Sequence, residues 1–380
     1  MVGARPNFMK AAPVYRALAE LDPDVELLLV HTGQHYDAEM SVIFMEELEL
    51  PEPNVFLGVG SGTHGEQTAR ALVGVERVLL EHMPALCVVA GDVNSTLAAA
   101  LAASKLQIPV AHIEGGLRSF DDTMPEEANR RLTDHLSQIL LAHSEGATAN
   151  LLRENIEPER IHLVGNTMID SVFQHRSIAI GRRPWSTFGV EPGAFALVTL
   201  HRPALVDDAH LLGRTVEALS ALGRRVPIIF PVHPRTEARL LASGLDPEGL
   251  SKCGLNVCPP LGYLDFLGLE AEAAFVLTDS GGVQEETSAL GVPCFTLRDS
   301  TERPVTVELG TNLILGVDPD RIRTIPQLLM EETRPRGEIP LWDGWAGGRA
   351  ARVIVEFLGR VVPSISRHGG GLSKDRDDQS

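Results

Sequence analysis

The chain has 380 residues, and this length predicts two or at most three domains at ~150 residues each. Its 51 acidic and 33 basic residues give a formal charge of −18, which argues against a nucleic-acid or anionic-membrane surface, since these require broad positive potential. The hydrophobic content of 44% is typical of a globular protein. Apolar runs such as Leu97–Ala103 are far shorter than the ~20 residues that span a bilayer, and the N-terminus lacks the pattern of a signal peptide.

The four cysteines are scattered, without a CxxC motif or paired Cys/His spacing. This usage is typical of reduced thiols in a cytoplasmic protein. The histidines, His112 among them, also lack HExxH or any other zinc-binding spacing. The sequence therefore predicts a cytoplasmic protein without a catalytic metal.

The first half alternates short apolar runs with amphipathic stretches, a pattern typical of a parallel sheet covered by helices on both faces. Strands are predicted at Val25–Thr32, Ala85–Ala90, Val110–Ile113, Gln138–Ala142 and His162–Val164. Helices are predicted at Phe8–Leu21, Ala38–Leu48, Thr63–His82, Ser95–Leu106, Pro125–His135 and Glu145–Glu154. Only Met1 and Val2 precede Gly3, whereas a central strand usually has ~5 residues, so we expect the natural start to lie upstream.

A second series of the same kind follows a Gly- and Pro-rich segment at Gly181–Gly193, where we expect the hinge. Its strands are predicted at Phe195–Leu200, Pro227–Pro231, Asn256–Cys258, Phe275–Thr278 and Cys294–Thr296. Its helices are predicted at Asp208–Leu222, Thr236–Ala242, Tyr263–Glu272 and Val283–Leu290. The expected fold is thus α/β, with two doubly wound, Rossmann-like domains, residues 1–180 and 181–365, facing across a cleft. The last helix is free to pack back on the first domain, and the polar tail 366–380 is expected to be disordered.

Three acidic side chains of the first half follow strands or begin helices, the positions that border such a cleft. Asp92 follows a strand, Glu114 ends one, and Glu126 opens a helix. Helix capping is the simplest interpretation of Asp92 and Glu126. Glu114 has no helix beside it, and the following Gly115 and Gly116 permit close approach of the backbone. Together the carboxylates indicate proton transfer or stabilisation of a cation.

The second half supplies a site for an anion. Ser280, Gly281 and Gly282 lie between a strand and a helix, where bare backbone N–H groups suit a diphosphate. Glu286, one turn further, is placed either to accept bonds from ribose hydroxyls or merely to complement the helix dipole. Arg303 follows the next strand and is a further candidate for phosphate binding.

Cationic groups are needed at this site because a dianionic ligand must approach a molecule of charge −18. Arg5 and Lys10 supply them from the first domain. His201 ends the strand Phe195–Leu200 and is a candidate general acid or phosphate ligand, although a lone histidine is more often structural.

Taken together, these segments resemble the UDP-N-acetylglucosamine 2-epimerase family, which has the GT-B architecture. The segments that carry the resemblance are GARPNFMKAAP (3–13), TGQHYD (32–37), GDVNSTLAAALAA (91–103), HIEGGLRS (112–119), MPEEANRRLTDH (124–135), VGNTMID (164–170), LHRP (200–203), TDSGGVQEE (278–286) and RDSTERP (298–304). Their order along the chain makes the resemblance specific.

The resemblance implies interconversion of UDP-N-acetylglucosamine and UDP-N-acetylmannosamine, without metal, nicotinamide or other cofactor, in a homodimer. UDP is eliminated to give a 2-acetamidoglucal and then re-adds. The C2 proton becomes removable only as oxocarbenium character develops at C1, so the site must stabilise both the leaving diphosphate and the ring cation. The residues matching catalytic positions of the family are Asp92, Glu114, Glu126 and His201, and those matching UDP contacts are Arg5, Lys10, Phe266, Ser280, Gly281, Gly282, Glu286 and Arg303.

Three other activities are compatible with such a site. Water could capture the intermediate and release N-acetylmannosamine and UDP. The substrate could be another UDP-HexNAc derivative. A GT-B glycosyltransferase would use the same diphosphate site. The carboxylates Glu114 and Glu126 favour epimerisation over this transfer, because a transferase does not need exchange of the C2 proton.

Overall fold

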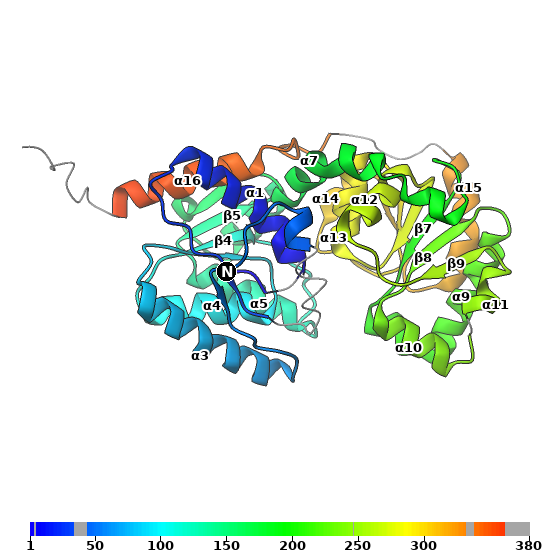
Figure 1. Cartoon of the computed structure of the whole chain (residues 1–380), viewed down its shortest axis with the longest axis horizontal. Coiled ribbons are helices and arrows are strands. Elements are labelled where there is room, and N and C mark those ends of the chain that lie inside the picture. Colours follow the sequence, from blue (N-terminus) through cyan, green and yellow to red (C-terminus); the bar gives the residue numbers. More distant parts are fainter. Residues whose placement is uncertain (4, 34–43, 246, 332–337, 362–380) are drawn as a thin grey trace, which may run out of the picture.

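The computed structural model describes residues 1–3, 5–33, 44–245, 247–331 and 338–361. They form two α/β domains lying side by side (Figure 1), each with a parallel sheet and helices on its faces. The predicted fold class is thereby confirmed. The predicted tail 366–380 and part of the predicted helix Ala38–Leu48 lie outside the described residues, and residues 44–47 of that helix are helical.

The first domain contains a four-stranded parallel sheet of order β3-β4-β5-β6 and a two-stranded pair, β1 and β2. Val2 lies between them: it forms a parallel bridge with His31, while the Met1 amino group donates to the Val88 carbonyl of β3. The strands are β1 (Val30–His31), β2 (Val55–Phe56), β3 (Cys87–Ala90), β4 (Val110–Gly115), β5 (Ile139–Ala142) and β6 (Ile161–Leu163).

Apart from α7, the α-helices of the first domain follow the predicted order. They are α1 (Arg5–Leu21), α3 (His64–His82), α4 (Asn94–Lys105), α5 (Pro125–Leu136), α6 (Glu145–Arg153), the 3₁₀ turn η1 (Pro158–Arg160) and α7 (Thr167–Gly181). Helix α3 begins in a capping box, in which Thr63 and Glu66 bond each other's backbone N–H.

The second domain contains a six-stranded parallel sheet of order β12-β11-β10-β7-β8-β9. Its strands are β7 (Ala196–Thr199), β8 (Ile228–Pro231), β9 (Leu255–Cys258), β10 (Phe275–Thr278), β11 (Cys294–Thr296) and β12 (Asn312–Ile314). Its helices are η2 (Pro184–Phe188), α8 (Pro203–Val206), α9 (Ala209–Gly223), α10 (Pro234–Ala242), α11 (Pro247–Ser251), α12 (Tyr263–Glu272), α13 (Gly281–Leu290), α14 (Pro304–Glu308), η3 (Pro319–Thr324) and α15 (Ile325–Met330).

The two domains share a buried apolar core. Phe8 of α1, Met168 and Val172 of α7, and Leu264 and Leu267 of α12 belong to one cluster. The last helix, α16 (Ala346–Val361), then returns to the first domain and lies beside α1 (Figure 1). There Ala350 and Ile354 pack with Val14 and Leu18, and the buried Asp170 accepts bonds from the N–H groups of Ala346 and Gly347.

Several elements differ from the predicted secondary structure, among them one strand and one long helix. The predicted strand Val25–Thr32 is paired only at Val30–His31, because its neighbours Val2 and β2 are themselves short. Helix α7 was not predicted, since its first turns are buried between α1 and α12 and leave no polar face to create a helical period.

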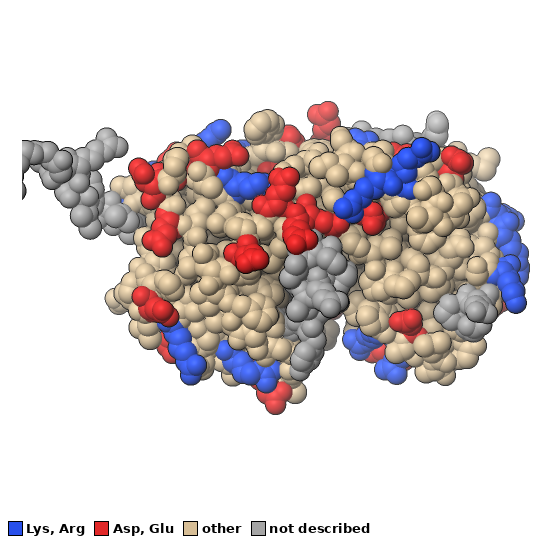
Figure 2. Space-filling model, viewed as in Figure 1, with Lys and Arg blue, Asp and Glu red and all other residues tan. Residues whose placement is uncertain are grey.

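On the face in Figure 2, acidic side chains gather near the place where the two lobes meet. In the part of the chain that the structure describes, no helix is long and apolar enough to cross a membrane.

Candidate active site between the two domains

An ion-paired cluster joins the two domains. The Lys10 ammonium of α1 contacts the Glu114 carboxylate of β4, whose other oxygen lies 3.2 Å from Arg303 Nη2 of the second domain. All three side chains are buried. The structure thus brings together three of the predicted site residues, which are far apart in the sequence.

The backbone around this cluster has an unusual conformation. Glu114 has φ +72°, a region that side chains rarely adopt, and β4 changes register between Ile113 and Gly115. Gly91, with φ +69°, turns the chain directly before Asp92, and a Cβ on it would lie 3.3 Å from Lys10 Nζ. Such conformations are concentrated at functional sites, because they hold side chains in positions that regular strands do not allow.

The electrostatics of Glu114 follow from its partners. Burial favours the neutral carboxyl, but the charges of Lys10, Arg303 and His143 outweigh it and lower the pKa of Glu114 to about 2. Burial also disfavours the Arg303 cation, and its three carboxylate neighbours, Glu285, Glu114 and Glu302, still raise the pKa of Arg303 above its usual value. In this arrangement Glu114 is therefore ionised.

Arg303 lies against the first turn of α13. Its Nε is 2.8 Å from Glu285 Oε2, and a Cβ on Gly281 would collide with the Arg303 guanidinium. Glu285 also accepts a bond from Asn166, and burial raises the pKa of Glu285 to about 7 against the opposing charge of Arg303. Gly281 is thus required for the close approach of the arginine to the helix N-terminus, where an anion would bind.

His201 is oriented by Asp279. The His201 Nδ1 lies 2.8 Å from Asp279 Oδ1, and the Asp279 Oδ2 accepts bonds from the backbone N–H of His201 and Arg202, each at 2.8 Å. Asp279 is fully buried, whereas the His201 side chain is 43% exposed. This geometry directs the second ring nitrogen away from Asp279 and leaves the ring accessible to a ligand.

The other predicted carboxylates lie on the first domain. Asp92 receives bonds from Arg130 Nη2 and Nε at 2.6 and 2.9 Å. Of the adjacent acids Glu126 and Glu127 at the start of α5, Glu127 is the buried one, and it accepts bonds from Ser119 and Arg130. Glu126 is half-buried, and no hydrogen bond joins it to another described residue.

Glu286 is buried in α13, and its carboxyl group interacts electrostatically with that of the buried Glu270 of α12. Burial raises the pKa of Glu286 to about 8 and raises the pKa of Glu270 well above its usual value. Burial of two carboxyl groups side by side thus favours their protonated, neutral form. In the described part of the chain, neither Glu286 Oε1 nor the two Glu270 carboxyl oxygens have a hydrogen-bond donor.

The remaining predicted residues occupy the expected elements. Ser280 is the N-cap residue of α13, its side chain makes no capping bond, and Gly282 follows in the first turn. Phe266 packs against the apolar core of the second domain and is partly buried. Arg5 begins α1, and its side chain lies outside the described residues.

Sequence reasoning gave no role to Asp279, Glu285 or Arg130, although each directly contacts a predicted site residue. Asp279 and Glu285 lie within the quoted segment 278–286, and Arg130 within 124–135. Their membership of these segments was the available signal. Charge pairing between distant segments leaves no local pattern in the sequence, so the contacts of these three residues could not be predicted from it.

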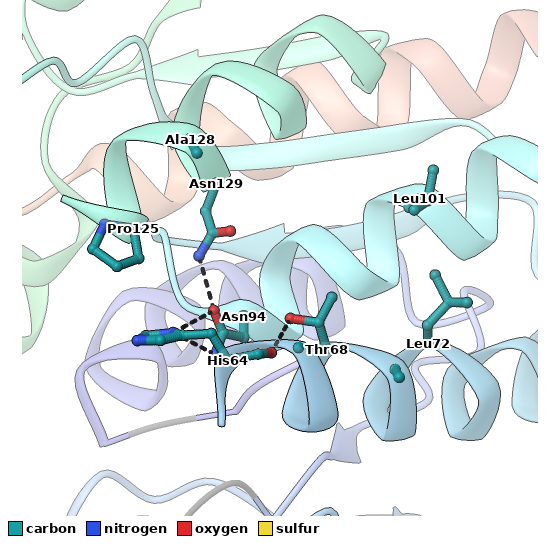
Figure 3. Close-up of a pocket in the computed structure, with 10 residues that line it drawn as sticks. His64, Thr68, Leu72, Asn94, Leu101, Pro125, Ala128 and Asn129 are labelled. Carbon is teal, nitrogen blue, oxygen red and sulfur yellow. Dashed lines mark hydrogen bonds between the residues drawn. The ribbon is translucent and has the colours of Figure 1, made fainter. Parts of the chain in front are cut away.

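A cavity of about 520 Å³ lies in the first domain between α3, α4 and α5 (Figure 3). Asn94 and Asn129 form part of its wall; they bond each other, and Asn129 also bonds the Asp92 carbonyl. Over the described ranges, no group of three or more His, Cys, Asp or Glu side chains is arranged to hold a metal ion. The absence of a metal from the reaction stays a prediction.

Comparison with known proteins reveals extensive similarity. The family model described as UDP-N-acetylglucosamine 2-epimerase matches residues 17–358. The UDP-N-acetylglucosamine 2-epimerase of Methanocaldococcus jannaschii is 45% identical, over 93% of this chain and 97% of its own length. A Pseudomonas aeruginosa relative, named UDP-2,3-diacetamido-2,3-dideoxy-D-glucuronate 2-epimerase, is 41% identical over 95% of this chain and 99% of its own.

Solved structures agree with this relationship. The M. jannaschii enzyme in complex with UDP-GlcNAc and UDP superposes with a TM-score of 0.86 at 44% identity, covering 93% of this chain and 98% of that one. The Neisseria meningitidis UDP-GlcNAc 2-epimerase bound to UDP-GlcNAc gives a TM-score of 0.83 at 30% identity, covering 94% and 98%. The predicted GT-B architecture is thereby confirmed, and the chain belongs to the UDP-N-acetylglucosamine 2-epimerase family.

Proposed function

We propose that the protein interconverts UDP-N-acetylglucosamine and UDP-N-acetylmannosamine by epimerisation at C2. The observation that carries this proposal is the meeting of Lys10 and Glu114 of the first domain with Arg303 of the second. One site then contains both a carboxylate for the sugar ring and cations for a diphosphate, which elimination of UDP requires.

In this reaction the bond from C1 to the UDP oxygen breaks, and the C2 proton passes to a carboxylate. The second domain binds UDP: Arg303, the α13 N-terminus at Ser280–Gly282 and His201 stabilise the leaving diphosphate. Glu286 binds the ribose, and Phe266 lies on the uracil side. The first domain adds Arg5 and Lys10, and Asp92, Glu114 and Glu126 form the acid–base and cation-stabilising set. Re-addition of UDP after protonation on the opposite face gives the epimer.

Substrate binding changes the partners of Glu114. A diphosphate that attracts Arg303 and Lys10 withdraws the two cations that lower the pKa of Glu114. Since a carboxylate with a higher pKa is a stronger base, arrival of the diphosphate prepares Glu114 for proton abstraction.

A second candidate substrate is a UDP-sugar carrying a second acetamido group and a carboxylate. The 41% identity to the P. aeruginosa enzyme, over nearly the whole of both chains, favours it. The same elimination and re-addition would serve both substrates.

We also propose a cytoplasmic homodimer. The four cysteines are free, as expected in a reducing compartment. Val73 and Leu80 lie seven residues apart, and thus on one face of α3, with 45% and 55% exposure, and exposed apolar faces mark protein interfaces. Light scattering of the wild type and of Leu80→Lys tests this: a dimer dissociated by the substitution supports the proposal, and a wild-type monomer contradicts it.

The proposed reaction is tested by incubating the protein with UDP-N-acetylglucosamine in D₂O, without an acceptor. UDP-N-acetylmannosamine with deuterium at C2 supports the proposal. Free N-acetylmannosamine and UDP indicate the hydrolysing reaction, and absence of exchange and product contradicts C2 chemistry on this sugar. A parallel incubation with UDP-2,3-diacetamido-2,3-dideoxy-D-glucuronate distinguishes the two substrates by their kcat/KM values.

A further inference from the structure

In the first domain, His112 and Asp134 form a buried pair. His112 Nδ1 lies 2.7 Å from Asp134 Oδ1, and the two side chains are 1% and 0% exposed. His112 belongs to β4 and Asp134 to α5, so the pair joins a strand to the helix that covers it. Neither residue has a place in the reaction proposed above.

Each member of the pair bonds the backbone of a loop that bears a carboxylate. The His112 Nε2 lies 2.8 Å from the carbonyl oxygen of Gly91, the residue before Asp92. The Asp134 Oδ2 accepts a bond of 3.1 Å from the N–H of Gly116, two residues after Glu114. Both loops have positive φ, at Gly91, Glu114 and Gly116, so they need such bonds to keep their shape.

The hydrogen-bond partners of His112 and Asp134 indicate which atoms of the pair donate and which accept. The Gly91 carbonyl and the Asp134 carboxylate are both acceptors, so both contacts are satisfied when each ring nitrogen of His112 carries a hydrogen. Burial favours a neutral Asp134, but its bond to His112 and the charges of His112 and Arg118 prevail and lower the pKa of Asp134. Arg118 contacts Asp134 at 2.8 Å and is held from the other side by Glu154.

We propose that His112 and Asp134 are positioning residues that hold the Asp92 and Glu114 carboxylates in register for the reaction. The inference rests on the proposed function, because it assigns the pair to the same site. A displacement of about 1 Å at such loops can cost ~100-fold in rate, so two bonds that fix both loops at once have a large effect on turnover.

Paired substitutions separate the two bonds. His112→Gln places an amide near the Nε2 position and keeps the bond to Gly91, whereas His112→Asn places it near Nδ1 and keeps only the bond to Asp134. Asp134→Asn retains a carbonyl oxygen for Gly116, and its amide donates to Nδ1 of a His112 that carries its hydrogen on Nε2, whereas Asp134→Ala loses both bonds. The control for a loss of stability alone is Val75→Ala, which removes buried apolar contacts of α3 in the core of the same domain.

We expect Asp134→Ala and His112→Asn to lower kcat by ~10- to 100-fold. KM and the UDP dissociation constant should change by less than about threefold, because the UDP contacts lie mainly in the second domain. Asp134→Asn and His112→Gln should recover most of kcat, and Val75→Ala should lower Tm without changing kcat. An unchanged kcat in Asp134→Ala, a parallel loss of UDP affinity, or equal loss in the conservative variants would overturn the proposal.

Amide hydrogen exchange gives a readout independent of activity. Peptides covering residues 91–96 and 114–118 should exchange faster in His112→Asn and Asp134→Ala, and at the wild-type rate in the conservative variants. Unchanged exchange in both loops contradicts positioning even if the wild type acts on another sugar. If the wild type has no epimerase activity, the proposed function is refuted. Faster exchange in the two disruptive variants would still show that the pair anchors both loops.

Discussion

Glu114 and Arg303 form a buried ion pair across the two domains, with Arg303 Nη2 3.2 Å from Glu114 Oε1. They are separated by 189 positions in the sequence. A carboxylate proposed to act on the sugar is thus ion-paired with an arginine proposed to bind the diphosphate. Binding of the diphosphate would therefore change the basicity of the Glu114 carboxylate.

Replacement of the carboxylate tests this pair directly. Glu114→Gln should lower kcat by about 10²- to 10⁴-fold, the scale of a positioned acid–base or electrostatic group, while the protein remains folded. Steady-state assays with UDP-N-acetylglucosamine measure the change. Glu81→Gln, at an exposed position of α3, serves as control. Wild-type turnover in Glu114→Gln would place the site elsewhere.

The His201–Asp279 contact predicts a graded loss. His201→Ala should lose about 10²- to 10⁴-fold in kcat, because it removes the group proposed to contact the diphosphate. Asp279→Asn should lose about 10- to 100-fold, because the ring remains but its orientation is less restricted. A variant Asp279→Asn that turns over like the wild type would show that His201 needs no orienting partner.

Gly281 should not tolerate a side chain. In Gly281→Ala the new Cβ meets the Arg303 guanidinium and displaces it from the helix N-terminus. A lost bond to a charged group costs about 1.5–3 kcal/mol, so UDP should bind about 10- to 100-fold more weakly in calorimetric titrations. Gly213→Ala in α9, where a Cβ meets open space, is the control and should bind UDP normally. Equal affinity in both variants would contradict the close approach of Arg303.

The Glu270–Glu286 pair predicts how stability depends on pH. Burial raises the pKa of Glu286 to about 8, whereas the same group in the unfolded chain titrates near ~4.3. The folded state therefore binds more protons between these values, and its stability falls as the pH rises through them. Glu286→Gln cannot ionise, so its Tm should fall less than that of the wild type between about pH 5 and pH 8.5. Parallel Tm profiles would show that the pair does not hold a proton.

Docking of the last helix on α1 depends on Gly347. A Cβ there would lie 2.7 Å from the Pro13 backbone carbon, whereas a Cβ on the adjacent Gly348 meets nothing within 4 Å. Gly347→Ala should therefore destabilise the protein by about 1–3 kcal/mol in denaturant titrations. Gly348→Ala should be neutral or stabilise by up to about 1 kcal/mol. If the two variants unfold alike, the packing of α16 differs from that described.

The sequence by itself determined the alternation of strands and helices and the order of the family segments, because apolar periodicity and glycine turns are local properties. It also indicated Lys10, Glu114 and Arg303 as site residues. Only the tertiary structure decided that these three side chains meet, that Glu127 is buried whereas the adjacent Glu126 is half-buried, and that Asp279 orients His201. Such contacts form between residues distant in the chain when sheets and helices pack, and no local pattern records them.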